Sequence, residues 1–478
     1  MQAVKLAGLE PAPVLGFFEA ISNIPHGSWN TSRLRDWLIA FAKDRALRYI
    51  CDEGGNVIIF KDATPGYEDH PPLILQSHMD MVCAKDADCT HNFECEGLDL
   101  AHDEEFIWAK GTSLGADDGL GIAYILAILD DKTLPHPALE AVFTDEEEVG
   151  MGGAKKLDCS VLTGRRMLNM DTFNEGVFTV GSAGGVKVDC SLDAVYTPCS
   201  GTFLQLDLVH FKGGHSGANI HKLHANCIKV LADLLTEIRR LTGVRLVRLL
   251  GGTSPNAIPK DVHATIMLES DCTEAVIALC QSFQDTMHTS FDEPDAVISA
   301  QSVTAEAAIS QNDTNRIIDL LRNAPNGLQA WIPELPDVVQ TSLNVGRICL
   351  DEKFLVEYQL RSSVLSEKDD LRKALVALGE KQGMAVRCHG ENPAWPYRTE
   401  SPFCDTMTEL WEEMFGQAPK VAVFHVGLEC GIFAEKIPDL EVVSTCSIAR
   451  GVHTSSEKMS IPSAQRFWPF LKKLLSRL

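Results

Sequence analysis

Short apolar runs alternate with helical patterns over the first third of the chain. The runs at 73–75, 141–143 and 167–170 have the length and composition of buried strands. Between the first two, residues 118–129 (DGLGIAYILAIL) are apolar almost all round, which predicts a helix packed into a core. Strands that alternate with helices are typical of βαβ units, so this region predicts an α/β domain around a mainly parallel sheet.

A different pattern occupies the middle of the chain. Apolar and polar positions alternate over residues 203–211, which predicts a half-buried strand. A helix with one apolar face is expected between Ile228 and Leu241. Further expected elements are strands at 341–350 and 354–361 and a helix at 367–382. The pattern of this middle segment therefore predicts an α+β domain.

The α/β character returns near the C-terminus, with expected strands at 421–424 and 441–444. Glycine and proline gather near 181–185 and 391–396, as they do at domain boundaries. We expect one α/β domain, split into residues 1–183 and 394–478, with an α+β domain inserted as residues 184–393.

Composition excludes several partner classes. The 478 residues include 66 acidic and 42 basic side chains, a formal net charge of -24. Nucleic acids and anionic membrane surfaces attract basic faces, so neither is expected as a partner. No apolar run reaches the roughly 18 to 20 residues of a membrane span. The 15 cysteines form no CxxC pair and predict free thiols in a cytoplasmic protein. Cys89, His91 and Cys95 match no common zinc spacing, and we interpret them as part of a surface loop.

Histidines and acids follow several of the apolar runs. The set is His78, Asp80, Asp117, Asp118, Glu146, Glu147, Glu148, Asp171 and His453. In open α/β sheets, ligands bind at the carboxyl edge of the strands. Each residue also has a structural interpretation: a hydrogen-bonded histidine, an aspartate N-cap, a solvated first helical turn or a turn cap.

These residues belong to five separate elements of the expected fold. If all five elements meet at one sheet edge, acids that repel one another lie close together. Two divalent ions would remove the repulsion. Imidazole and carboxylate ligands without cysteine suit Zn²⁺, with Mn²⁺ or Co²⁺ as substitutes.

Seven motifs in order resemble those of a known family. They are SHMDMV (77–82), GADDG (115–119), EEVGMGGA (147–154), NMDT (169–172), GGHSG (213–217), HVGLECG (425–431) and His453-Thr454. Together they resemble the di-zinc dipeptidases and deacylases of the aminoacylase/carnosinase type, and among these the aminoacyl-histidine dipeptidases. The resemblance covers essentially the whole chain. It implies a di-zinc catalytic domain with an inserted lid and dimerisation domain.

The resemblance also implies roles for individual residues of the catalytic domain. His78 and Asp171 would bind one zinc, Glu148 and His453 the other, and Asp117 both, with a cis peptide to the next residue. Asp80 would orient the imidazole of the first site. Two zinc ions per subunit are therefore implied.

Glu147 is implied as the general base, acting on a water shared by the metals. The family motif leaves one residue between its glutamate pair and a glycine, which selects Glu147 and Glu148. A register shifted by one would select Glu146 and Glu147 instead.

In the inserted domain, His215 resembles the lid histidine that stabilises the oxyanion, in its own or a partner subunit's site. Asn256, Arg361 and Gly427 resemble substrate-holding residues, with the guanidinium as partner of a peptide carboxylate. The resemblance thus implies a cytoplasmic homodimeric dipeptidase for Xaa-His peptides, including β-alanyl-histidine.

The sequence is also compatible with other functions. A deacylase of N-acyl amino acids or a tripeptidase could use the same scaffold, and so could an inactive metal-dependent binding protein. A cysteine hydrolase based on Cys83 or Cys430 is a further alternative, but it would leave the acids unexplained.

Overall fold

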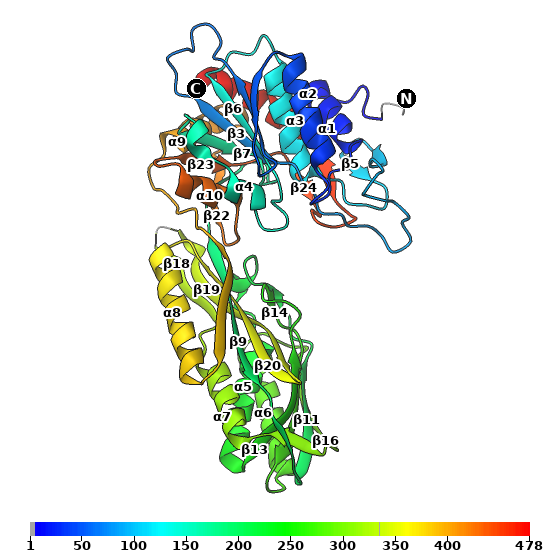
Figure 1. Cartoon of the computed structure of the whole chain (residues 1–478), viewed down its shortest axis with the longest axis vertical. Coiled ribbons are helices and arrows are strands. Elements are labelled where there is room, and N and C mark those ends of the chain that lie inside the picture. The colour runs from blue at the N-terminus through cyan, green and yellow to red at the C-terminus, as the bar shows by residue number, and fades with distance from the viewer. Residues whose placement is uncertain (1–4, 334) are drawn as a thin grey trace. The chain divides into compact units, whose positions relative to one another are not determined.

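The computed structural model describes residues 5–333 and 335–478 and contains two compact units (Figure 1). The first unit comprises 1–181, 397–423 and 428–478, of which residues 1–4 lie outside the described part. The second comprises 182–396 and 424–427. The sequence pattern places the short segment 424–427 with the α/β domain, whereas this division places it in the second unit.

The first unit is built on a sheet that has eight strands among the described residues, in the order β1-β2-β6-β3-β7-β23-β8-β22. Their bounds are β1 Arg48–Cys51, β2 Val57–Lys61, β3 Leu73–His78, β6 Leu139–Thr144, β7 Arg166–Asn169, β8 Val177–Ser182, β22 Lys420–Phe424 and β23 Glu441–Ser444. Strands β6, β3, β7 and β23 are parallel. Strands β1, β2 and β8 pair antiparallel. The α/β class is confirmed, and the sheet is mixed with a parallel centre.

Helices pack on this sheet, and their bounds are α1 Ala12–Ser22, α2 Ser32–Asp44, α3 Ala116–Asp130, α4 Gly152–Lys156, α9 Pro402–Phe415, α10 Glu429–Lys436 and α11 Ile461–Arg477, with a 3₁₀ turn at Cys159–Val161. Figure 1 shows α1, α2 and α3 together at one side of the sheet, and α9 and α10 at the other. Helix α3 packs between α1 and strand β3. Its side chains from Leu120 to Leu129 are consequently buried, which explains why the sequence is apolar all round.

A smaller antiparallel sheet completes the first unit, with the strand order β24-β25-β5-β4. Its strands are β4 Leu100–His102, β5 Phe106–Ala109, β24 Ala449–Arg450 and β25 Lys458–Ser460. Short strands with little apolar alternation carry a weak sequence signal, so this sheet was not predicted.

The second unit is an antiparallel sheet with helices, in the order β16-β11-β15-β13-β19-β20-β9-β21, with β18 paired to β19. The strands are β9 Gly184–Asp193, β11 Thr202–Val209, β13 Val244–Gly251, β15 Val262–Leu268, β16 Val297–Val303, β18 Gly327–Ile332, β19 Leu335–Leu350, β20 Lys353–Ser362 and β21 Ala385–Asn392. Two small ribbons pair β10 Tyr196–Pro198 with β17 Ala307–Ile309, and β12 Gly214–His215 with β14 Ala257–Ile258.

The helices of this unit are α5 Cys227–Leu241, α6 Thr273–Ser290, α7 Gln311–Asn323 and α8 Leu365–Lys381, with a 3₁₀ turn at Ile220–Lys222. The apolar face of α5 is buried in the core of the unit from Ile228 to Ile238, as the spacing predicts, but its last expected member, Leu241, is exposed. Among the described residues, no helix combines the length and apolar character that a membrane span requires.

Candidate metal centre

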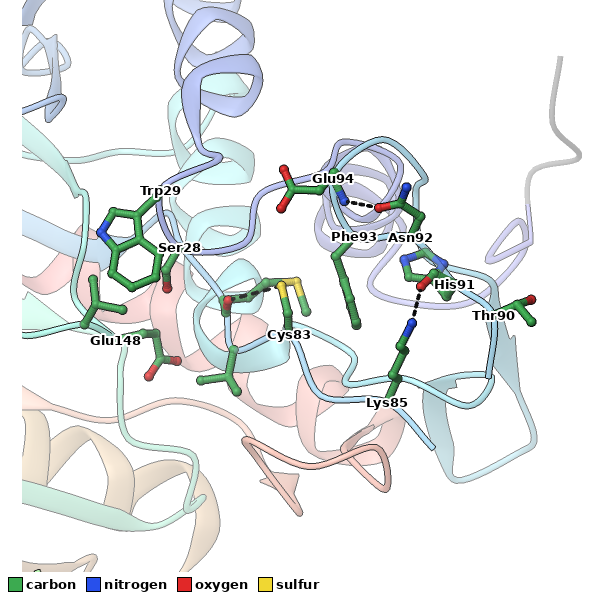
Figure 2. A pocket seen from close by; sticks show the side chains of 13 residues that line it. Ser28, Trp29, Cys83, Lys85, Thr90, His91, Asn92, Phe93, Glu94 and Glu148 are labelled. Atoms are coloured by element: carbon green, nitrogen blue, oxygen red, sulfur yellow. Dashed lines mark hydrogen bonds between the residues drawn. The ribbon is translucent and has the colours of Figure 1, made fainter. Parts of the chain in front are cut away.

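Three adjacent strands of the central sheet end beside one another in the first unit. His78 is the last residue of β3 and lies opposite Thr144, the last residue of β6. Asp171 lies two residues beyond the end of β7, which pairs with the other edge of β3. Because these strands are parallel, their carboxyl ends bring the histidine, the glutamates after β6 and the aspartate together. A hollow of about 610 Å³ opens beside Glu148 at this edge (Figure 2).

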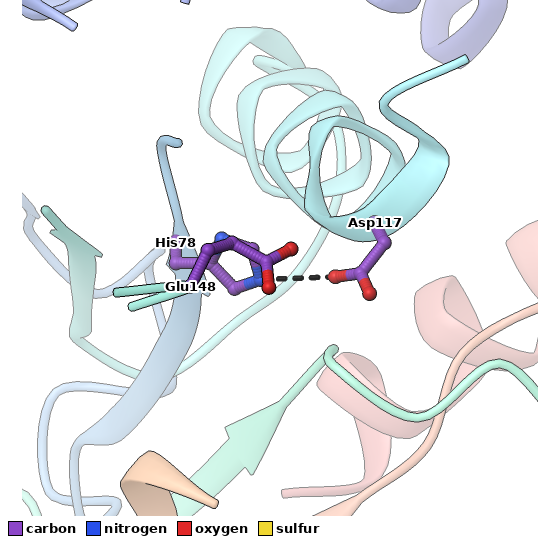
Figure 3. Close-up of side chains that lie close together, drawn as sticks. All are labelled: His78, Asp117 and Glu148. Carbon is purple, nitrogen blue, oxygen red and sulfur yellow. Dashed lines mark hydrogen bonds and ion pairs between the residues drawn. The ribbon is translucent and has the colours of Figure 1, made fainter. Parts of the chain in front are cut away.

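Asp117 enters the centre from the beginning of α3 (Figure 3). The backbone at Asp117 and Asp118 is non-helical, and the peptide bond between them is cis, as the resemblance implies. The helix N-cap is Gly115, and neither aspartate caps it, so the N-cap interpretation is wrong. Instead, Asp118 accepts hydrogen bonds from the Ser77 hydroxyl and from the backbone N–H of His78, the latter at 3.2 Å. These bonds tie the start of the helix to β3.

The two oxygens of Asp117 face two different imidazoles. Oδ1 lies 2.9 Å from His78 Nε2, and Oδ2 lies 3.1 Å from His453 Nε2. Asp171 Oδ1 is 3.8 Å from His78 Nε2, and Glu148 Oε1 is 3.1 Å from His453 Nε2. The side chains therefore form two groups of one imidazole and two carboxylates, which share Asp117.

His453 reaches this centre from the smaller sheet. It follows β24 and has a φ of +64°, a left-handed conformation that turns the chain towards the acids. The expectation that all five elements lie at the edge of one sheet is therefore wrong for Asp117 and His453. Strands β3, β6 and β7 supply one wall of the centre, while the start of α3 supplies Asp117 and the loop after β24 supplies His453.

The electrostatics of the cluster follow from its acid content. Burial alone would lower the pKa of His78, but Asp117, Asp171 and Asp80 hold that pKa well above its ordinary value. Hydrogen bonds to Asp117 and Glu148 raise the pKa of His453 to about 11. Burial and repulsion from Asp117 raise the pKa of Asp171 to about 7. The acids therefore repel one another and depend on nearby positive charge.

A divalent cation fits this donor set. Ligand atoms of His78, Asp117 and Glu148 lie within 4.8 Å of one another, the grouping that the described residues offer for a metal ion (Figure 3). Glu148 Oε1 is buried and faces His453 Nε2 at 3.1 Å. Imidazole nitrogens and carboxylate oxygens are ligands of zinc and of related transition metals. The cluster is thus a candidate metal site in which a cation would replace imidazolium protons as the counter-charge.

Asp80 positions residues on two sides of this site. Its carboxylate accepts hydrogen bonds from the backbone N–H groups of Glu147 and Glu148, at 2.9 and 3.3 Å, and from Ser28 Oγ at 2.8 Å. His78 Nδ1 lies 2.9 Å from the backbone carbonyl of Asp80 and 3.7 Å from its carboxylate. Asp80 therefore orients the imidazole through its main chain and the glutamate loop through its side chain.

The three consecutive glutamates after β6 have different environments. Glu146 lies 3.3 Å from Lys156 Nζ, at the surface. Glu148 faces His453. Burial of Glu147, together with repulsion from Asp171, raises the pKa of Glu147 well above its ordinary value. The run is a turn between β6 and α4, so it is not a solvated helical turn. These environments favour the register that pairs Glu147 with Glu148.

Two buried glutamates around the site were not predicted. Glu457 accepts hydrogen bonds from the backbone N–H groups of Leu114, Gly115 and Asp117, at 2.7, 3.0 and 3.2 Å. It thereby holds the segment that presents the shared aspartate. Glu429 accepts from Gln76 and Thr144 and joins β3 to β6. Glu429 lies in the motif HVGLECG. Glu457 lies 340 residues from Asp117, and no sequence motif links the two residues.

Replacing Glu457 by alanine is expected to lower the free energy of unfolding by about 2–4 kcal/mol, because three buried N–H groups lose a charged acceptor. Denaturant unfolding of the metal-free protein measures this change. Glu104→Ala is the control, since Glu104 is exposed on the neighbouring loop. A change within about 0.5 kcal/mol of the wild type in Glu457→Ala would show that these bonds do not hold the segment.

The remaining expected site residues lie in the second unit. His215 is in β12, which pairs with β14 directly after Asn256. Its Nδ1 accepts hydrogen bonds from the backbone N–H groups of Gly217 and Ala218, at 3.2 and 3.1 Å. The ring proton is therefore on Nε2. Burial lowers the pKa of His215, and the charge of Arg361 lowers it further. The imidazole is therefore a neutral hydrogen-bond donor.

Arg361 is buried and forms no ion pair with the described residues. Burial lowers its pKa to about 10. Its charge also acts on His425, a buried histidine that the motif contained but to which no role was assigned. Gly427 lies two residues further on, in the same unit. An unpaired buried guanidinium indicates a place for an anionic group.

The cysteine alternative does not agree with the structure. Burial raises the pKa of Cys83 to about 11 and that of Cys430 well above its ordinary value, so neither thiol is readily ionised. A nucleophilic thiolate is therefore disfavoured at both positions.

Comparison with known proteins identifies the family. The sequence model of Peptidase family M20/M25/M40 matches residues 74–477. The chain belongs to this family. This metallopeptidase is 32% identical to the cytosol non-specific dipeptidase of Escherichia coli (strain K12), and the match covers 99% of each chain.

The structure gives a similar result. The aminoacylhistidine dipeptidase of Vibrio alginolyticus superposes on the metallopeptidase with a TM-score of 0.93 at 33% identity, over 99% of this chain and 98% of that one. A tripeptidase of Staphylococcus aureus gives a TM-score of 0.57 at 15% identity over 98% of each chain, which shows the fold alone.

Proposed function

We propose that this metallopeptidase is a cytoplasmic dipeptidase that cleaves Xaa-His dipeptides, including β-alanyl-histidine, and accepts other dipeptides. The observation that carries the proposal is the pair of imidazole–carboxylate groups that share Asp117. The names of the two full-length relatives support a dipeptide substrate and, for one of them, a cytosolic location. A match to Peptidase T covers only 13% of the chain, which gives less support to a tripeptide substrate.

The donor geometry suggests how two ions would be held. His78 and Asp171 would bind one divalent ion, Glu148 and His453 the other, and Asp117 both. Zn²⁺ suits these ligands, with Co²⁺ or Mn²⁺ as substitutes. When bound, such ions lower the pKa of water and polarise a scissile carbonyl.

Glu147 is the proposed general base. It follows β6 directly beside Glu148, and its backbone is fixed by the hydrogen bond to Asp80. Its carboxylate would take a proton from the attacking water and deliver a proton to the leaving amine. This role also separates the proposal from an inactive binding protein, which would not need a base at that position.

Residues of the inserted unit would complete substrate binding. His215 presents Nε2–H as a donor, the form needed to stabilise an oxyanion. Arg361 supplies an unpaired fork for the free carboxylate of a peptide. Asn256 and Gly427 are proposed to hold the substrate backbone.

We also propose a homodimer formed through the inserted unit. Nine of the eleven large hydrophobic side chains that are exposed among the described residues belong to this unit, Ile277 and Phe291 among them. Apolar side chains of this kind mark an association surface where they form a contiguous patch. Sedimentation analysis of the full chain tests the proposal, and a monomer at all concentrations would contradict it.

A substrate panel tests the proposed specificity. The zinc-restored protein is given β-alanyl-histidine, α-dipeptides, one dipeptide amide, tripeptides and acetyl amino acids. We expect cleavage of the dipeptides and little cleavage of the amide, which lacks the carboxylate for Arg361. Preference for acetyl amino acids would indicate a deacylase, and preference for tripeptides would indicate a tripeptidase.

A further inference from the structure

The hollow beside Glu148 has one wall from the N-terminal segment and another from a loop that follows β3. Figure 2 shows Trp29 and Glu148 on one side and Phe93, Lys85 and His91 on the other. Its volume of about 610 Å³ lies within the ~300–1,000 Å³ typical of small-molecule sites. The Phe93 ring packs edge-on against His91 at 4.6 Å between centroids, which holds that wall in place.

Hydrogen bonds fix the two walls relative to each other. Asn30 Nδ2 lies 3.4 Å from the carbonyl of Phe93 and 3.3 Å from that of Glu94. Asn30 also closes a turn through its backbone N–H, which donates to Gly27 at 2.8 Å. Ser28, in the same turn, donates to Asp80 at 2.8 Å. The turn that carries Trp29 is therefore bonded both to the opposite wall and to the metal centre.

Trp29 is unusual in two respects. Its side chain is 77% exposed, the largest exposed fraction among the described large hydrophobic residues. Its φ of +64° lies in the left-handed region, which a bulky side chain rarely adopts. Backbone strain of this kind clusters at functional sites. Here it accompanies an exposed indole at the hollow.

The charges at the hollow distinguish the two ends of a peptide. Glu148 and Glu94 line it, and Asp80 lies directly behind the Trp29 turn. Lys85 is the basic residue of the lining, and its ammonium donates to the His91 carbonyl at 2.9 Å. With Glu148 engaged by a metal ion, Glu94 and Asp80 are the acids that favour a protonated α-amino group over a carboxylate here.

We propose that this hollow binds the side chain of the amino-terminal residue of the substrate, and that Trp29 and Phe93 select large apolar or aromatic side chains there. The inference rests on the proposed dipeptidase function and adds a specificity site to it. Trp29 and Phe93 would contact the side chain on opposite faces, while the α-amino group lies towards the acids.

Trp29→Gly tests the proposal without threatening the fold, since glycine suits the left-handed backbone at this position. We expect kcat/KM for Phe-Ala to fall roughly fivefold to tenfold, chiefly through KM, while kcat/KM for Gly-Ala stays within about twofold. Trp29→Phe should retain most of the preference. Glu104→Ala, which changes an exposed side chain on the loop between β4 and β5 outside the hollow, is the control and should leave kcat/KM for both dipeptides unchanged.

Calorimetric binding of analogues with a reduced peptide bond separates this proposal from the dipeptidase assignment. The Phe-Ala analogue should bind wild type roughly fivefold to tenfold more tightly than it binds Trp29→Gly, whether or not turnover occurs. Equal binding, or equal losses for the Phe-Ala and Gly-Ala analogues, would overturn the pocket. A larger loss for the Ala-Phe analogue would overturn the assignment to the amino-terminal residue. Failure of wild type to cleave any dipeptide would overturn the proposed function instead.

Discussion

Glu147→Gln is expected to lower kcat by about 10²–10⁴-fold, because the amide cannot accept the proton of the attacking water. Metal content should stay at the wild-type level, since Glu147 is not among the proposed ligands. Steady-state kinetics and elemental analysis of the same preparation measure both quantities. KM should change little, because the loss falls on the transition state.

Glu146→Gln is the matched control for this prediction. Glu146 is the neighbouring carboxylate, and it lies 3.3 Å from Lys156 at the surface. Its replacement should leave kcat within about twofold of wild type, in keeping with surface substitutions generally. If Glu146→Gln lost activity and Glu147→Gln kept it, the base would be in the other register.

Asp117→Asn is expected to release metal and to lower activity by at least about 100-fold. Even residues that only orient ligands cost about 10–100-fold in metal affinity when replaced, and Asp117 faces both imidazoles directly. An asparagine keeps the shape of the side chain but removes its negative charge and one acceptor oxygen. Titration of the apoprotein with Zn²⁺, followed by calorimetry, measures the change in affinity and stoichiometry.

Asp88→Asn serves as the control, because Asp88 is an exposed acid on the loop after β3. Its replacement removes the same charge from the protein without touching the centre, so zinc affinity should match that of wild type. Binding of two ions by Asp117→Asn with wild-type affinity would show that the aspartate is not shared between them.

The sequence predicts the strongly apolar elements of the fold well. Strands β3, β6 and β7 and helix α3 appear where runs of buried residues indicate them, because burial on both faces leaves a continuous apolar signal. Elements with mixed polarity were harder to place. Strand β19 begins at Leu335, six residues before the expected start, since its first part contains a proline and exposed side chains. The antiparallel strands β1 and β2 were not predicted either.

The sequence predicts the residues of the candidate site better than the residues that support it. Motifs at strand ends indicate His78 and Asp171 because local order places them at one edge. The support of the site depends on contacts between distant segments, which a single sequence does not reveal. Glu457 is one such case, and the route of His453 through the smaller sheet is another.

Metal removal and restoration, with ions counted and activity measured on the same samples, tests the central claim most directly. The chelated protein should lose nearly all hydrolysis of β-alanyl-histidine, because the acids of the centre then have no cation to activate water. Zinc should restore activity as the second equivalent per chain is bound. Full activity in the metal-free protein, or full activity with one ion per chain, would contradict the proposed two-metal centre shared by Asp117.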